Sequence, residues 1–324
     1  MNITEKVPQL IEHAVNESWK HVFLVSNPVT LIVSKLLIET LKLDVDKILI
    51  ISLRRTETSS IGLPSHRPAR QWIDRFLVKF CDVRPLTQRI LNYINNSGER
   101  FVLYTAWDYE ESGSIPSVRS IIDNKMCMGH FYLEEGQQSY RPTKPYPSRH
   151  KDKSYAEITK QFKDDEDRLN HRQYYGDDGS AFFGLFEEVY PNIPPEKVFI
   201  CNDFNILKKV YEPFLLDIDS IAISCAERRL KKNGLDFMLR ALVDELPDGG
   251  VMKLHPSFYE NGKKVLMIEK KLKHISNGMV ALAPPQAIIE IEMLFSEKKL
   301  IGSLTSLIRY ASYFGSTYKE IKLY

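Results

Sequence analysis

Cysteine is scarce in this chain of 324 residues, and the 4 cysteines that it has lie far apart. No two of them have the short spacing of a zinc site or of a dithiol redox motif. Most lie in apolar stretches, which is typical of free thiols in a reducing compartment. We therefore expect neither a disulfide framework nor a cysteine metal site from Cys81, Cys127, Cys201 and Cys225.

We also expect neither a secretory signal nor a membrane-spanning segment. The first twenty residues contain Glu5, Glu12 and Glu17 and no apolar core. The most apolar early stretch, VFLVSNPVTLIVSKLLIETL, is interrupted by Asn27-Pro28 and contains Lys35, which argues against a bilayer span. We expect a cytoplasmic protein. Any association with the inner face of the cytoplasmic membrane would have to be peripheral, through basic surface or partners.

Charge of one sign is not in large excess. The formal net charge of +2 is too small to indicate a nucleic-acid partner. Basic residues cluster at 228–232 (RRLKK) and at 269–273 (EKKLK). Such runs are typical of solvated helix faces, and contact with membrane headgroups is the alternative interpretation.

Short apolar runs alternate with helical patterns along most of the chain. Strands are predicted at 21–26, 47–53, 100–106 and 128–133, and a second series at 197–202, 220–225, 250–255, 279–283 and 299–303. Helical patterns, among them 234–246, 288–295 and 305–314, separate them. This rhythm predicts an α/β protein with two doubly wound, Rossmann-like domains that face a central cleft, 1–214 and 215–324.

Two acidic pairs compete for a catalytic role. Glu134-Glu135 precedes Gly136 at the end of an apolar predicted strand, and sheets of this kind bind ligands at the carboxyl ends of their strands. Asp177-Asp178 follows the polar HRQYYG and leads into AFFGLF, which favours a turn and a helix cap. A solvated turn is the alternative for either pair, but position favours the glutamates.

Lys253 and His255 lie two residues apart on one predicted strand and therefore point the same way. An ammonium group and an imidazole on one side could hold a phosphate and protonate it as it leaves, with Pro256 fixing the turn. The alternative is a strand-end histidine bonded to backbone.

Three hydroxyl residues lie between the predicted strand 299–303 and the helix that follows: Ser303, Thr305 and Ser306. Hydroxyl groups beside the free N–H groups of a helix start suit a phosphate. An ordinary N-cap is the alternative interpretation.

The acid-acid-glycine, Lys-x-His-Pro and hydroxyl motifs, in this order, resemble the bacterial sialyltransferases with a GT-B fold, which include lipooligosaccharide sialyltransferases and polysialyltransferases. The opening VFLVSNPVTLIVSKLLIE is similar to the family's first strand, loop and helix. The resemblance implies an inverting, metal-independent enzyme without a cofactor. It would transfer a sialic or related nonulosonic acid from CMP-sialic acid to a galactoside or sialoside of a bacterial surface glycan, such as lipopolysaccharide or capsule.

The resemblance also implies roles. Glu134 or Glu135 would be the general base; spacing does not separate the neighbours. His255 would stabilise or protonate the departing phosphate, with Lys253 adding positive charge. Thr305, with the other hydroxyls, would bind that phosphate.

An acidic residue of the PPQAIIEIEMLF stretch would contact the nucleotide, Glu292 rather than Glu290, and a helix-surface glutamate is the alternative for both. Ser26 and Asn27, with Asp177-Asp178, are acceptor-side candidates. Two other functions stay open: a GT-B transferase that uses another nucleotide sugar, such as CMP-Kdo or a nucleotide diphosphate sugar, and a non-catalytic glycan- or nucleotide-binding relative.

Overall fold

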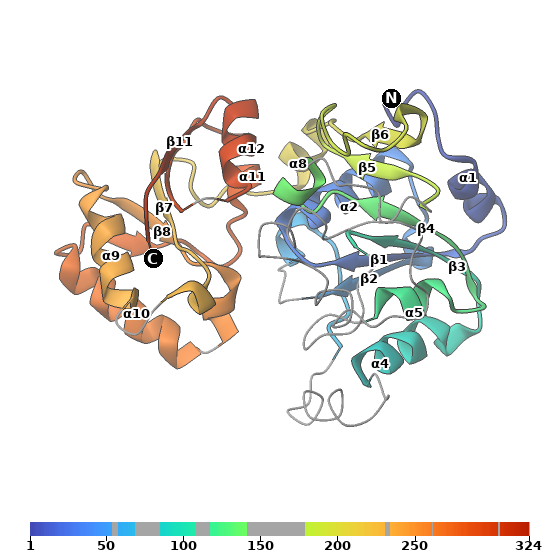
Figure 1. Ribbon diagram of the computed structural model, residues 1–324, viewed down its shortest axis with the longest axis horizontal. Coiled ribbons are helices and arrows are strands. Elements are labelled where there is room, and N and C mark those ends of the chain that lie inside the picture. Colours follow the sequence, from blue (N-terminus) through green and yellow to red (C-terminus); the bar gives the residue numbers. More distant parts are fainter. Residues whose placement is uncertain are drawn as a thin grey trace, which may run out of the picture. The chain divides into compact units, whose positions relative to one another are not determined.

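The computed structural model describes residues 1–53, 58–68, 85–107, 117–140, 179–230, 234–260, 262–303 and 305–323. The chain forms two compact units, each built around its own parallel sheet (Figure 1). The first unit comprises Met1–Thr58 and Leu63–Ile206, and the second comprises Ser59–Gly62 and Leu207–Tyr324.

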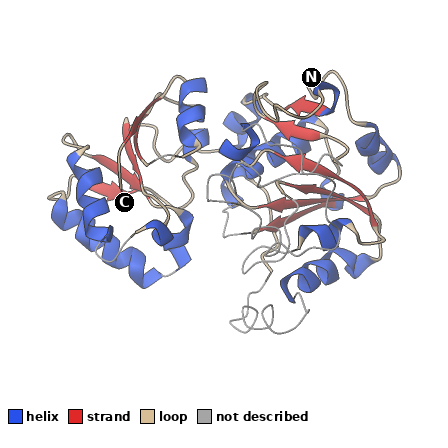
Figure 2. Cartoon of the chain, viewed as in Figure 1, coloured by secondary structure: helices blue, strands red, loops and turns tan. Residues whose placement is uncertain are grey.

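Within the described residues, the sheet of the first unit has six strands in the order β2-β1-β3-β4-β5-β6, and all neighbouring pairs are parallel (Figure 2). The strand order reverses at β1, because β2 lies on one side of it and the later strands lie on the other. The strands are β1 (Lys20–Val25), β2 (Ile48–Ser52), β3 (Phe101–Thr105), β4 (Cys127–Leu133), β5 (Phe182–Gly184) and β6 (Val198–Ile200).

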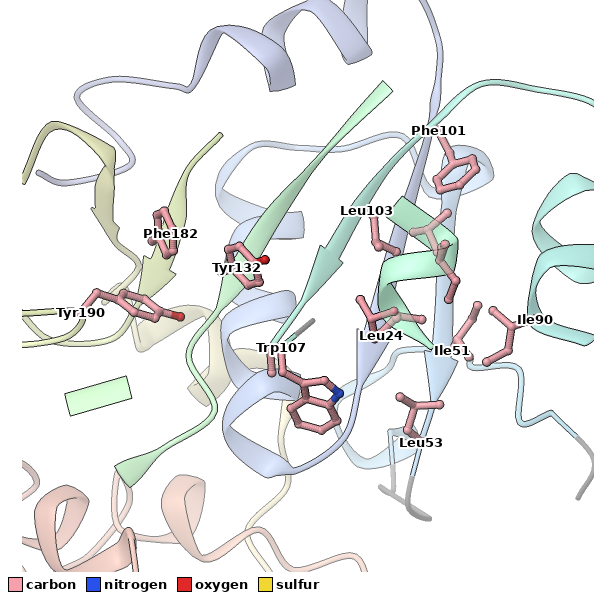
Figure 3. Packing of buried hydrophobic residues seen from close by; sticks show 14 of the residues in the cluster. Leu24, Ile51, Leu53, Ile90, Phe101, Leu103, Trp107, Tyr132, Phe182 and Tyr190 are labelled. Carbon is pink, nitrogen blue, oxygen red and sulfur yellow. The ribbon is translucent and has the colours of Figure 1, made fainter. Parts of the chain in front are cut away.

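Helices cover both faces of this sheet. On one face α4 (Pro85–Ile94) and α5 (Val118–Ile122) pack against the strands, and their apolar side chains join those of β1, β2 and β3 in one core (Figure 3). Ile90 of this core lies beside Ile51, and Leu24 lies beside Leu103. The opposite face carries Phe23, whose ring stacks on that of Tyr104. There α2 (Pro28–Thr40) contacts β1 and β4.

The turn from β1 into α2 follows from the Asn-Pro-x-Thr pattern. Asn27 Oδ1 accepts the Thr30 N–H at 2.9 Å, and Thr30 Oγ1 accepts the Asn27 N–H at 3.2 Å, which is a capping box. Pro28 occupies the first helical turn, where a missing N–H costs nothing. The other described helices up to residue 210 are α1 (Gln9–Asn16) and α8 (Asn205–Val210), which spans the boundary between the units. The described 3-10 turns are η1 (Val45–Lys47), η3 (Asn95–Ser97), η4 (Gln137–Tyr140) and η5 (Pro195–Lys197), together with η2 (Ser59–Ile61), which belongs to the second unit.

One expectation for the middle of the chain is wrong. AFFGLF does not begin a helix but forms β5, whose Phe182 and Phe183 are both buried. An interior parallel strand is covered on both faces, so it shows no alternation by which the sequence could reveal it. The strand predicted at 197–202 is observed as β6, which pairs with β5 in the first sheet. Asp177 and Asp178 lie outside the described residues.

The sheet of the second unit has five described strands in the order β11-β10-β7-β8-β9, again all parallel. They are β7 (Ser220–Ile223), β8 (Gly250–Lys253), β9 (Val280–Leu282), β10 (Lys299–Gly302) and β11 (Thr317–Glu320). The helices are α9 (Gly234–Asp244), α10 (Gly262–Ile275), α11 (Ile289–Glu292) and α12 (Leu307–Tyr313), with turns η6 (Glu227–Arg229) and η7 (Pro256–Glu260). In the described part of the chain, no helix has the length and apolar character needed to cross a membrane.

Two buried charged side chains hold the segment after residue 210 to the second unit. Glu292 accepts a hydrogen bond from the Tyr211 hydroxyl at 2.6 Å. It also accepts the backbone N–H groups of Phe214 at 2.9 Å and Leu215 at 3.0 Å. Lys298 Nζ donates to the Leu215 carbonyl oxygen at 2.6 Å. This segment is therefore an integral part of the second unit.

Candidate functional site

The strand order of the second sheet reverses between β7 and β10, since β8 and β9 lie on one side of β7 and β10 and β11 on the other. Doubly wound sheets bind ligands at such a reversal, outside the carboxyl ends of the strands. The residues that follow β7 and β10 are Ser224 and Ser303, and both are buried. This edge of the second sheet is the candidate site.

His255 is held beside the end of β7. The strand β8 ends at Lys253, so His255 lies beyond it and its ring is exposed. Its backbone N–H donates to Ser224 Oγ at 2.7 Å. The Ser257 N–H points at Nδ1 at 3.2 Å, and the Ser257 hydroxyl lies 2.9 Å from the same nitrogen. Because Nδ1 accepts this N–H, we infer that the neutral ring carries its proton on Nε2.

Lys253 is the last residue of β8, so contrary to expectation it does not share a strand with His255. Its Nζ donates to the carbonyl oxygens of Pro284 at 2.9 Å and Pro285 at 2.8 Å, which lie just beyond β9. Burial lowers the pKa of Lys253 to about 8, and the charge of Glu290 opposes that shift. The lysine thus secures the turn after β9.

Glu290 and Glu292 are both buried, so the surface interpretation is wrong for both. Burial raises the pKa of Glu290 to about 7, against the opposing effects of its backbone hydrogen bond and of Lys253. The carboxylate of Glu292 accepts hydrogen bonds from Tyr211, Phe214 and Leu215. The charges of both glutamates act on Lys253, and the raised pKa is that of Glu290.

The hydroxyl residues follow β10 where two strands approach closely. A Cβ at Gly302 would lie 2.6 Å from the carbonyl oxygen of Ile223, so only glycine fits beside β7. Thr305 Oγ1 accepts the Leu307 N–H at a long 3.4 Å, and Ser306 makes no capping hydrogen bond. Both side chains are half-buried, so their hydroxyls are not consumed by the helix start.

Sequence reasoning missed three residues of this edge. Ser224 and Ser257 position His255, but isolated serines carry no signal in a sequence. Arg229 ends the turn η6, which follows β7, and its charge acts on Cys225, whose pKa is raised chiefly by burial. Arg229 therefore lies in a 3-10 turn rather than on the face of an α-helix. Its position after a predicted strand was the signal that could have placed it at the site.

The predicted acid pair lies at the carboxyl edge of the first sheet and divides into two different environments. Glu134 is fully buried, and its Oε2 accepts the Leu185 N–H at 2.7 Å. Glu135 is half-buried. Its N–H donates to Ser139 Oγ at 3.0 Å, and its carbonyl oxygen accepts from Asn27 Nδ2 at 2.9 Å. The backbone of Glu135 is therefore fixed on both sides.

Asn27 and Ser26 lie at the same edge of the first sheet. Asn27 uses both ends of its side-chain amide, since Oδ1 caps α2 while Nδ2 holds Glu135. Ser26 is buried, and its Oγ has no hydrogen-bond partner among the described residues. Among the described residues of either unit, no group of three or more His, Cys, Asp or Glu could hold a metal ion.

Comparison with known proteins identifies the fold. No family model matches the chain, and no curated protein is similar to it. The structure of S. aureus MnaA with UDP is similar, with a TM-score of 0.54 and 12% identity, over 94% of this chain and 79% of that chain. UDP-GlcNAc 2-epimerase from Neisseria meningitidis bound to UDP-GlcNAc has a TM-score of 0.46 and 13% identity, over 93% and 82%. The E. coli heptosyltransferase WaaC has a TM-score of 0.34 and 12% identity, over 92% and 87%.

These findings confirm the predicted fold class, an α/β protein of the GT-B type with two Rossmann-like domains. The resemblance to sialyltransferases is wrong, and with it the CMP-sialic acid donor, the sialoside or galactoside acceptor and CMP-Kdo. The S. aureus MnaA structure, with a TM-score of 0.54, contains UDP. The physical reason is that polar residues at strand ends are common to parallel sheets that bind any nucleotide, so motifs of this kind do not specify the base or the sugar.

Proposed function

We propose that this chain is an enzyme that acts on a UDP-sugar and binds the UDP moiety at the reversal between β7 and β10. One observation carries the proposal: the exposed ring of His255, held at Nδ1 by Ser257 and tied to the end of β7 through Ser224, offers an Nε2–H donor at this edge. The fold likeness to S. aureus MnaA, whose structure contains UDP, supports the choice of nucleotide.

A diphosphate brings more negative charge than one imidazole can balance. Arg229 lies in the turn η6 that follows β7, close enough for its charge to act on Cys225, and supplies a permanent positive charge there. The hydroxyls of Thr305 and Ser306 provide neutral donors after β10. In this assignment, His255 and the hydroxyls orient the phosphate oxygens and Arg229 contributes most of the charge-dependent affinity.

Arg229→Gln tests where the diphosphate binds. We expect UDP to bind about 10-fold more weakly, because a charge-assisted hydrogen bond to phosphate contributes roughly 1.5–3 kcal/mol. Affinity for UMP should fall less and affinity for uridine should not change. Isothermal titration of the full chain with UDP, UMP, uridine and CMP gives all four affinities.

Arg240 on α9 is an exposed arginine of the same unit, so Arg240→Gln is the matched control. An equal loss for UDP and uridine in Arg229→Gln would place the arginine away from the phosphates. Failure of the unmodified chain to bind UDP, or tighter binding of CMP, would remove the proposed function itself.

We propose Glu135 rather than Glu134 as the candidate general base of the first unit. Glu134 is fully buried and accepts a backbone N–H, whereas Glu135 is half-buried and has a fixed backbone. Epimerisation by proton removal from carbon and inverting glycosyl transfer both use such a base. Following UDP release and the configuration of the sugar by NMR distinguishes the two reactions.

Asn27→Asp tests whether Asn27 positions this base. An aspartate still accepts the Thr30 N–H and caps α2, but it cannot donate to the Glu135 carbonyl oxygen. We expect kcat to fall about 10-fold with UDP affinity and thermal stability close to wild type, because general base catalysis depends on geometry. Glu135→Gln should lower kcat by at least roughly 10². Full turnover in Glu135→Gln would exclude it as the base.

A further inference from the structure

Helix α10 presents two different faces. Ile268 and Leu272 are buried and join the core of the second unit. The side chains at positions 263, 266, 267, 270, 273 and 274 recur at three- and four-residue spacing, which places them together on the other side of the helix. All six are exposed. The second unit therefore turns one continuous stripe of α10 outward.

This stripe, made of Lys263, Leu266, Met267, Lys270, Lys273 and His274, combines positive charge with exposed apolar area. Leu266 is 58% exposed and Met267 is 40% exposed, and both lie between the lysines. The stripe contains no acidic residue, and Glu269 lies at its flank. A solvated helix face would not need two adjacent large apolar side chains in water.

The lysines of α10 separate by face. Lys264, toward one flank, forms an ion pair with Glu227, and Lys271 forms one with Asp236 on α9 at 2.5 Å. Within the part of the chain that the structure describes, Lys263, Lys270 and Lys273 form no ion pair. The charges of Lys264 and Lys271 are thus balanced by acidic residues of the protein, whereas the positive charges of the stripe can interact with an external anionic surface.

We propose that this stripe of α10 docks the protein on a membrane surface that contains anionic lipid. Membrane-surface helices combine lysines with apolar side chains that enter the headgroup region. A protein partner fits less well, because interface centres are enriched in Tyr, Trp, Phe and Arg and depleted in Lys, and this stripe has three lysines and none of those four residue types. The proposal does not depend on the UDP-sugar assignment.

Sedimentation of the full chain with lipid vesicles tests the proposal. We expect binding to vesicles that contain phosphatidylglycerol, weakening with added salt, and none to vesicles of phosphatidylcholine alone. Replacing Lys263, Lys270 and Lys273 by glutamine should lower the partition coefficient by about 100-fold, since each lysine near an anionic surface contributes roughly fivefold. Leu266→Ser with Met267→Ser should lower it further at high salt.

The matched control replaces Lys208, Lys209 and Lys299 by glutamine, which removes the same charge from exposed positions outside α10. It should retain binding within about twofold if the stripe is the docking surface. Equal loss in the control would reduce the effect to net charge, and absence of binding to phosphatidylglycerol vesicles would also overturn the proposal. Circular dichroism of both triple variants should match wild type, because all six side chains are exposed.

Discussion

His255→Ala should lower turnover of the UDP-sugar by about 10²–10³-fold, which is the usual effect of removing one donor aimed at developing charge. The ring is exposed, so its removal should leave thermal stability near that of wild type. The backbone N–H of residue 255 still reaches Ser224 in the variant, so the end of β8 keeps its place. Steady-state kinetics with UDP release as the readout measures the effect.

Two variants make this result specific. Ser257→Ala frees Nδ1 from the hydroxyl but keeps the backbone N–H, so turnover should fall by less than in His255→Ala. His274→Ala removes another exposed histidine of the same unit and should have no effect on kcat. If His255→Ala keeps full turnover while UDP binds normally, the imidazole faces solvent rather than the phosphates, and the site must lie elsewhere on the sheet.

The architecture was readable from the sequence because each strand leaves a local signal. An apolar run followed by Asn-Pro and a helical pattern predicts β1 and α2, and the capping box between Asn27 and Thr30 is the physical reason. The same reasoning did not predict the strand that AFFGLF forms. Its strand, β5, is covered on both faces, so its periodicity does not distinguish it from a helix start.

The candidate site was predictable only in part. Strand-end position identifies His255 and the hydroxyls after β10, because the carboxyl edge of a parallel sheet is where ligands bind. Contacts such as that from His255 to Ser224 join positions distant in sequence, and no local pattern reveals them. The choice of nucleotide failed for a different reason, since the same residue types serve many phosphates.

Glu290 and Glu292 of α11 lie two residues apart in the sequence, and this spacing did not predict their different environments. Glu290 has its pKa raised to about 7 from 4.5, so between these values the folded state binds more protons than the unfolded state. Stability from Glu290 is therefore present below pH 4.5 and is lost as pH rises through 7. Glu290→Gln should be more stable than wild type at pH 8 and equal to it at pH 4, with Lys253, left without its countercharge, reducing the gain.

Glu292→Ala should do the opposite and lower the free energy of unfolding by about 3–5 kcal/mol at pH 8. The substitution leaves the Tyr211 hydroxyl and the N–H groups of Phe214 and Leu215 without their acceptor. Glu292→Gln keeps one oxygen and should lose less. Urea unfolding at pH 8 measures all three variants under one condition.

The contrast with Glu290→Gln is the control, because both residues lie on the same four-residue helix and both are buried. A surface or ligand-binding role for Glu292 predicts unchanged stability and weaker UDP binding. A structural role predicts the reverse, since a buried carboxylate with three donors stabilises the segment from Tyr211 to Leu215 whether or not nucleotide is present. Opposite signs for Glu290→Gln and Glu292→Ala at pH 8 would therefore separate a carboxyl group poised near neutrality from one that holds the chain together.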